Sequence, residues 1–293
     1  MPATESWTIG RLLTWTTDYL KQRGADNPRL DAEVLLAEAR GCQRIELYTA
    51  FDQEAQEPVR MAFRELVRRR AEGTPVAYLV GRREFYSLNF RVTPDVLIPR
   101  PETELLVVTL LDTIKTLPAS VTSISAVDVG TGSGNVAITC AKHCPRLQMT
   151  AVDLSPEALK VAELNAEDHK LQNRITFLHS DLLDAVPASQ RFDFIVSNPP
   201  YVTSDEMTQL PRDVGEHEPH MALDGGTEGT DVIARLISQA ATRLNPGGFL
   251  FMEISPMIQD SVLQLLHDAA CWDVLETVKD FARLPRIIQA RLT

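Results

Sequence analysis

From residue 98 onward, short apolar runs alternate with segments of helical periodicity, and this alternation constrains the fold more than any other feature. Apolar runs that suit buried strands cover residues 124–129, 149–153, 175–179 and 192–197. Helical patterns lie between them, and Ser155 followed by Pro156 suits an N-cap and a first helical residue. Because helices connect parallel strands, the sequence predicts an α/β fold with a parallel sheet covered by helices.

The same rhythm continues toward the C-terminus. A helix is expected over residues 230–244, and the apolar run 249–254 behind Asn245-Pro246-Gly247-Gly248 predicts another strand. The tail segments 273–278 and 286–292 suit a closing hairpin.

The first 80 residues show helical patterns only. Asp31 is expected to cap a helix that ends at Gly41, and a second apolar stripe ends near Gly73. After this region, alternating apolar and polar residues over 86–92 predict one half-buried strand. We therefore expect a helical domain over 1–80, a β connector over 81–97 and an α/β domain over 98–293.

Composition narrows the class of protein. The chain has 293 residues and a net charge of -11, which argues against a partner bound mainly through a phosphate backbone, although Arg68–Arg70 could contact RNA locally. Four cysteines without zinc spacing predict neither disulfides nor a metal site. No membrane-spanning run or signal peptide is seen, so we expect a cytoplasmic protein, or an organellar one if residues have been removed.

A glycine loop, Asp128–Asn135, follows the first buried strand and opens a helix, where glycine allows a tight turn and close approach of a ligand. Its spacing is GxGxG, which differs from the GxGxxG of dinucleotide sites, and no GK[ST] follows. The alternative is a purely structural turn between a strand and a helix.

Asp153 ends the next predicted strand and Asp181 follows the third, so with Asp128 they are predicted to surround one pocket. Three carboxylates would repel a pyrophosphate but suit S-adenosyl-L-methionine, which carries a sulfonium, an ammonium and a ribose diol. The alternative is that these aspartates are solvated strand ends.

Asn198-Pro199-Pro200-Tyr201 directly follows the buried strand 192–197. The prolines stiffen this loop and lack N–H groups, so the Asn198 amide oxygen and the Pro199 carbonyl are fixed acceptors that suit an incoming NH2 group. They would hold a planar nitrogen for in-line methyl transfer, with Tyr201 packed against the flat acceptor group. No general base is required, because the methylated nitrogen is acidic. On its own, the motif is also compatible with a structural turn.

These motifs resemble those of the release factor glutamine methyltransferases (the PrmC/HemK family), over almost the whole chain. The matching segments are Gly81–Tyr86, Leu97–Glu104, Asp128–Gly134, Asn198–Tyr201, Glu218–Pro219 and Ala222–Gly226. The segment Ile98-Pro99-Arg100-Pro101-Glu102-Thr103-Glu104 is the most specific of them. Two positions depart from the family pattern: Leu182 stands where many relatives carry an aromatic residue, and Ser255 where many carry glycine.

The resemblance implies a Rossmann-like, seven-stranded methyltransferase domain with an antiparallel last strand, preceded by a helical substrate-recognition domain. It implies methylation of the side-chain amide of the glutamine in the Gly-Gly-Gln motif of peptide chain release factors, by a monomer without a metal. The residues carried over for the cofactor are Asp128, Gly130, Thr131, Gly132, Ser133, Gly134, Asp153, Asp181, Leu182 and Asn198. Those for the substrate and the reaction are Asn198, Pro199, Pro200, Tyr201, Arg100 and Glu102.

Two alternatives remain at this point. An adenine-N6 methyltransferase would share the Asn198–Tyr201 loop, but the acidic balance opposes a direct nucleic-acid substrate. A binding module without activity would not need Asn198 and Asp153. For Arg100 and Glu102, a helix start near Pro101 is as good an explanation as a direct contact.

Overall fold

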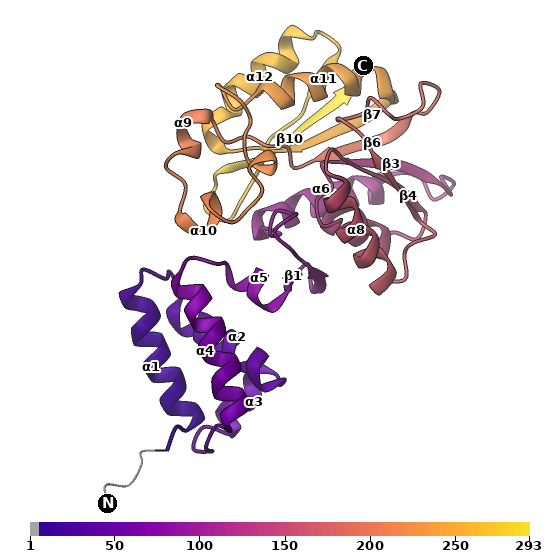
Figure 1. The fold of residues 1–293 in the computed structure, drawn as a ribbon. Helices are drawn as coiled ribbons and strands as arrows, with labels where there is room; N and C mark the ends of the chain where they lie inside the picture. The colour runs from indigo at the N-terminus through magenta and orange to yellow at the C-terminus, as the bar shows by residue number, and fades with distance from the viewer. Residues whose placement is uncertain (1–5) are drawn as a thin grey trace, which may run out of the picture. The chain divides into compact units, whose positions relative to one another are not determined.

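The computed structural model describes residues 6–293, which divide into two compact units, each described by itself (Figure 1). The smaller unit runs to Gly81 and includes Arg212–His217, and the larger consists of Arg82–Pro211 and Glu218–Thr293. The smaller unit contains α1 (Ile9–Gln22), α2 (Pro28–Arg40), α3 (Arg44–Thr49), α4 (Glu57–Ala71), α5 (Val76–Val80) and α10 (Arg212–Gly215).

The larger unit carries the strands and the remaining helices. Its strands are β1 (Arg82–Phe85), β2 (Leu88–Arg91), β3 (Ile124–Val129), β4 (Leu147–Asp153), β5 (Ile175–His179), β6 (Phe192–Ser197), β7 (Leu244–Glu253), β8 (Trp272–Val274), β9 (Val278–Lys279) and β10 (Pro285–Leu292). Its helices are η1 (Pro101–Thr103), α6 (Glu104–Thr116), α7 (Asn135–His143), α8 (Pro156–Asp168), α9 (Ser204–Met207), η2 (His220–Ala222), α11 (Asp231–Arg243), η3 (Pro256–Ile258) and α12 (Gln259–Asp268).

The smaller unit is a helical bundle with its own apolar core. The predicted cap at Asp31 is wrong, because Pro28 starts α2 one turn earlier and places Asp31 in the first turn. The Asp31 carboxylate instead accepts from Arg70 Nε at 2.8 Å, which joins α2 to α4. The helix ends at Gly41 as predicted, in the left-handed conformation that glycine favours.

The single strand predicted over 86–92 is also wrong, because the structure has a hairpin of β1 and β2 there. Tyr86 and Ser87 form its two-residue turn with φ of 51° and 60°. Such turns usually carry glycine or asparagine, so the sequence contained no signal for this one. The hairpin belongs to the larger unit, where Phe85 and Phe90 enter the core.

The main sheet has the strand order β5-β4-β3-β6-β7-β10-β8, and β9 pairs with β10 beside β8. Its eight strands therefore occupy seven positions. Strands β3 to β7 are parallel, and β10 runs antiparallel to β7. This confirms the predicted α/β fold with an antiparallel last strand.

Helices cover both faces of this sheet, as Figure 1 shows for the larger unit. One core cluster contains residues of α6, α7 and the hairpin, and the other contains residues of α11 and α12. Neighbouring strand residues alternate between the clusters, so Ala126 joins the first and Val127 the second. The strands are apolar on both sides because both sides are buried.

Asn165 connects the hairpin to the glycine loop. Its side chain on α8 is fully buried, and Oδ1 accepts from the Arg91 N–H at 2.7 Å. Nδ2 donates to the Arg91 carbonyl at 3.1 Å and to the Ser133 carbonyl at 2.8 Å. One amide thus holds two separate backbone segments in place.

We expect Asn165→Ala to lower the free energy of unfolding of the larger unit by about 2–3 kcal/mol, because buried backbone groups would lose their partner. Urea unfolding followed by circular dichroism measures this. Asn173→Ala, at an exposed position, is the matched control and should change stability by less than about 0.5 kcal/mol. Equal effects of the two substitutions would contradict the assigned role.

Candidate active site

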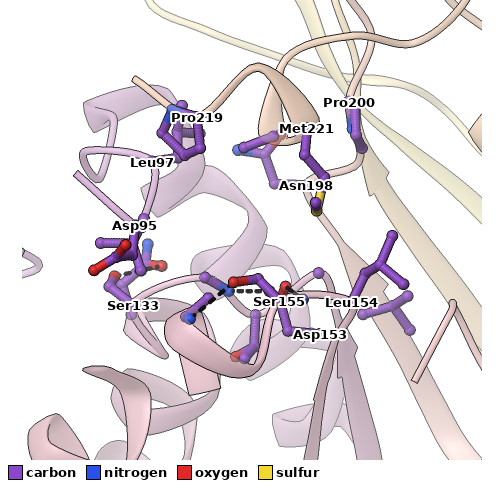
Figure 2. Close-up of a pocket in the computed structure, with 18 of the residues that line it drawn as sticks. Asp95, Leu97, Ser133, Asp153, Leu154, Ser155, Asn198, Pro200, Pro219 and Met221 are labelled. Carbon is purple, nitrogen blue, oxygen red and sulfur yellow. Dashed lines mark hydrogen bonds between the residues drawn. The ribbon is translucent and has the colours of Figure 1, made fainter. Parts of the chain in front are cut away.

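A cavity of about 510 Å³ lies at the carboxyl ends of β3, β4 and β6, entirely within the larger unit. Residues far apart in the chain line it, and Figure 2 shows Leu97, Asp153, Asn198 and Pro219 around one space. Carboxyl ends of parallel strands, next to a change in strand order, are where such folds bind ligands.

The three glycines of the loop have different roles. All have positive φ: 73° at Gly130, 55° at Gly132 and 78° at Gly134. Apart from atoms of its two chain neighbours, a Cβ on Gly130 or Gly132 would meet no heavy atom of residues 6–293 within 4 Å, so this backbone is open to the cavity that both residues line. Gly134 does not line the cavity, and a Cβ there would lie 2.9 Å from Ile138 Cδ1. Its role is therefore close packing at the start of α7.

Asp128 fixes this loop to α7. Its Oδ2 accepts from Thr131 Oγ1 at 2.7 Å and from the Ala137 N–H at 3.2 Å, so one carboxyl joins the loop to α7. Burial raises the pKa of Asp128 to about 7, although both hydrogen bonds favour the charged form. Thr131 and Ser133 also line the cavity and are buried.

Asp153 ends β4 and lines the cavity. Its Oδ2 accepts from the Gly132 N–H at 2.8 Å and its Oδ1 from the Ser155 N–H at 2.9 Å (Figure 2). These bonds fix the carboxylate, and each oxygen keeps a further lone pair for a ligand. Burial raises the pKa of Asp153.

The structure does not bring Asp181 into this cavity. Its carboxylate is partly exposed and accepts from Arg235 Nη2 at 2.7 Å on the surface. The neighbours Ser180 and Leu182 line the cavity instead. Leu182 has a φ of 49°, a left-handed conformation that is uncommon for a residue other than glycine. Two of the three predicted carboxylates therefore surround the cavity.

The loop after β6 supplies Asn198 and Pro200 to the cavity, whereas Pro199 and Tyr201 are not among its lining residues. Asn198 Nδ2 donates to Thr103 Oγ1 at 3.2 Å, which leaves Oδ1 of the amide as an acceptor. The Tyr201 hydroxyl donates to Glu253 Oε1 at 3.4 Å, and its ring packs against the core beneath the sheet edge. Tyr201 thus fixes the loop to the core.

Arg100 lines the cavity, and Glu102 does not. Arg100 Nη2 is 2.6 Å from Glu218 Oε1, and Glu218 Oε2 accepts from the Ile98 N–H at 3.2 Å. The Glu218 side chain is buried, so this pair joins the segment before η1 to the segment before η2. Both segments contribute walls of the cavity.

Three residues gained a structural role that the sequence did not indicate. Thr103, which lines the cavity, and Glu253, which does not, are both buried. Only their place in a segment of the family pattern, or at the end of an apolar strand, could have singled them out. Ser255, which replaces a glycine of many relatives, has a φ of -69° and caps η3 by accepting from the Met257 N–H. That conformation is open to any residue, so glycine is not needed here.

The cavity suits S-adenosyl-L-methionine. Its volume of about 510 Å³ is in the range of small-molecule sites. Asp153 offers acceptors for hydroxyl groups, the open backbone at Gly130 and Gly132 allows close approach, and the acidic edge favours a cation. No group of three or more His, Cys, Asp or Glu residues with metal-binding geometry occurs in the described part of the chain.

The comparisons with known proteins agree with this geometry. Residues 103–213 match the family profile described as "Methyltransferase small domain", and residues 11–81 match "PrmC N-terminal domain". The catalytic domain of human METTL16 with an RNA hairpin shares the fold, with a TM-score of 0.57 at 15% identity over 76% of this chain and 80% of that one. The fold and the site define an S-adenosylmethionine-dependent methyltransferase.

The most informative relatives are full-length. A release factor glutamine methyltransferase of Rhodopirellula baltica is 51% identical over 96% of this chain and 95% of its own. That of Koribacter versatilis is 41% identical over 93% and 94%. The chain belongs to the release factor glutamine methyltransferase family. In residues 6–293, no helix is long and apolar enough to cross a bilayer.

We expect Asp153→Ala to weaken S-adenosylmethionine binding at least about tenfold, because a fixed acceptor for the ribose hydroxyls is lost. Isothermal titration calorimetry measures the affinity. Asp181→Ala is the matched control, since this carboxylate lies outside the cavity and pairs with Arg235. A comparable loss for Asp181→Ala would show that Asp181 does reach the cofactor.

Asp128 should make stability depend on pH. Its pKa rises from 3.8 to about 7, so the folded state binds the proton more tightly than the unfolded chain. The stabilisation is complete below about pH 4 and is lost as the pH rises through about 7. We therefore expect the decrease in unfolding free energy from pH 5 to pH 8 to be smaller in Asp128→Asn, measured by urea titration. An unchanged decrease would contradict this assignment.

Proposed function

We propose that this protein transfers the methyl group of S-adenosyl-L-methionine to the side-chain amide nitrogen of the glutamine in the Gly-Gly-Gln motif of peptide chain release factors. The observation that carries the proposal is the Asn198 amide, which lines the cavity with its NH2 group engaged by Thr103. The oxygen of that amide is then available to accept from the NH2 group of the substrate. The names of the 51% and 41% identical relatives support the same substrate.

The cofactor supplies an electrophilic methyl group on a sulfonium, and the protein holds the two reactants. We propose that Asp153 and the backbone around Gly130 and Gly132 hold the cofactor. Ser180 and Leu182, which also line the cavity, would pack against the cofactor. Asp181 has no part in this proposal, because it is engaged by Arg235 on the surface.

The acceptor nitrogen is a poor nucleophile, since its lone pair is delocalised into the carbonyl group. Asn198 Oδ1, which faces the cavity, would accept a hydrogen bond from one of its N–H groups. The carbonyl of Pro199, which is not a lining residue of the cavity, would accept from the other, and the π face of the nitrogen would then point toward the methyl group. Both acceptors also stabilise the positive charge that develops on nitrogen in the transition state. The prolines help because a rigid loop loses little entropy when the substrate binds.

An adenine substrate would present a similar planar NH2 group to the same loop. The formal net charge of -11 opposes it, because nucleic-acid binding depends on clustered positive charge. The RNA-bound neighbour is only 15% identical, so its similarity concerns the fold alone.

The proposed function is tested with purified protein, labelled cofactor and a release factor. We expect label on the wild-type release factor and none when the glutamine of its Gly-Gly-Gln motif is replaced by alanine. Label that persists on the alanine variant would contradict the assigned acceptor. Methylated adenine after incubation with nucleic acid, together with an unlabelled release factor, would favour the second substrate class.

Asn198→Ala should lower kcat by about 100-fold or more and change cofactor affinity little, because the lost contact is made with the acceptor and strengthens in the transition state. Single-turnover kinetics and calorimetry measure the two quantities. Asn173→Ala, at its exposed position, serves as the control. A parallel loss of kcat and of cofactor affinity would exclude the assigned role of Asn198.

A further inference from the structure

Glu253 is a buried carboxyl that neither the cofactor site nor the proposed chemistry uses. It ends β7, and only 1% of its surface is exposed. Its Oε1 accepts from the Tyr201 hydroxyl at 3.4 Å, whereas Oε2 has no hydrogen-bond partner among residues 6–293. Because an ionisable group with an unpaired buried oxygen is costly, stability alone does not account for this residue.

The strand register places Glu253 beside the acceptor loop. Ser197 of β6 pairs with Met252 of β7, so Asn198 and Glu253 are the next residues on two neighbouring parallel strands. Thr103 lies next to both residues: its Oγ1 accepts from Asn198 Nδ2 at 3.2 Å, and its side chain is close enough to the Glu253 carboxyl to lower the pKa of that group. The three side chains form one chain of polar contacts that ends at the cavity.

The direction of the hydrogen bonds among these three side chains decides whether the oxygen or the NH2 group of the Asn198 amide faces the cavity. A hydroxyl donates one hydrogen bond, and when Glu253 is a carboxylate its unpartnered Oε2 is the acceptor available to the Thr103 hydroxyl. Its oxygen can then only accept from Asn198, which holds the NH2 group toward Thr103. With a donor at position 253, the Thr103 hydroxyl could instead accept from that donor and donate to Asn198 Oδ1. The amide would then turn its NH2 group toward the cavity.

We propose that Glu253 is a positioning residue that acts through Thr103 to make the oxygen of the Asn198 amide, and not its NH2 group, face the methyl acceptor. Glu253 also accepts from Tyr201, so the same carboxylate holds both ends of the loop. The inference rests on the proposed function, since it takes the acceptor to be an amide NH2 group.

Charged and titratable groups around Glu253 set the pH at which its carboxyl group ionises. Burial, together with the charge of Glu102 of η1, raises the pKa of Glu253 to about 7, although the Thr103 and Tyr201 hydroxyls and Arg286 of β10 act to lower it. A protonated Glu253 becomes a donor, so the hydrogen bonds among Glu253, Thr103 and Asn198 can run in the opposite direction. We therefore expect kcat to fall as the pH decreases through about 7.

The first test compares Glu253→Gln with the wild type. Glutamine keeps the shape but can donate, so kcat should fall about 100-fold, while cofactor affinity and melting temperature stay close to those of the wild type. The residual kcat of the variant should no longer fall as the pH decreases through about 7. A Glu253→Gln variant that keeps the wild-type kcat and pH profile would overturn the inference, as would a loss of cofactor affinity parallel to the loss of kcat.

Thr103 provides a matched pair that does not alter the buried carboxyl. Thr103→Val is isosteric but has no hydroxyl, and Thr103→Ser keeps it. We expect Thr103→Ser to be at least about tenfold more active than Thr103→Val at equal cofactor affinity. Equal activity of the two variants would overturn the inference, even if Glu253→Gln fails to fold.

A double-mutant cycle tests the direction of the hydrogen bonds among Glu253, Thr103 and Asn198. In Glu253→Gln the reversed Thr103 hydroxyl can donate to the carboxylate that Asn198→Asp introduces. Asn198→Asp should therefore lower kcat less in the Glu253→Gln background than in the wild type. Additive effects would contradict the reversal.

A readout independent of activity separates this inference from the proposed function. The side-chain NH2 signal of Asn198 in ¹⁵N-labelled protein should be protected from solvent exchange in the wild type and in Thr103→Ser, and lose protection in Thr103→Val. Unchanged protection would contradict the inference. A wild type that shows this protection but labels no release factor would contradict only the proposed function.

Discussion

The cavity depends on the pairing of β3 with β4 on one side and with β6 on the other. Val129 is opposite Val152 in one ladder and opposite Ser197 in the other, so all three strands end at the same level. The Ser197 hydroxyl donates to the Val129 carbonyl at 2.7 Å and ties two of these ends together. A shift of one residue in either ladder would move each side chain of the shifted strand from one core cluster to the other and separate the glycine loop from Asn198.

Three acidic side chains lie at the ends of β3, β4 and β7, and burial raises the pKa of each: Asp128, which is buried, Asp153, which is partly buried, and Glu253, which is buried. Backbone N–H groups and hydroxyls hold the first two in single orientations. Such groups cost folding free energy, and a chain selected for stability alone would replace them with apolar residues. Their common effect is a preorganised, acceptor-rich edge that matches a cationic methyl donor and an NH2 acceptor.

Local rules predicted much of this arrangement. The glycine loop, the helix start at Ser155 and the acceptor that Asn198 offers to the cavity each follow from a short stretch of sequence, and Ser155 indeed accepts from the Ala158 N–H. The errors arose where local patterns are ambiguous. The alternation over 86–92 passes through a tight turn made by Tyr86 and Ser87. Asp153 is the last residue of β4, whereas Asp181 comes two residues after the end of β5 and pairs with Arg235 at the surface.

The sequence by itself determined the α/β class, the order of its strands and helices along the chain, and the residue types available at each strand end, because backbone conformation depends on near neighbours. Tertiary structure alone decided which of those residues meet. The pair of Arg100 with Glu218 and the line from Glu253 through Thr103 to Asn198 each join side chains from separate segments of the chain. No local pattern encodes such contacts, since they form only when strand register and helix packing bring distant segments within hydrogen-bond distance.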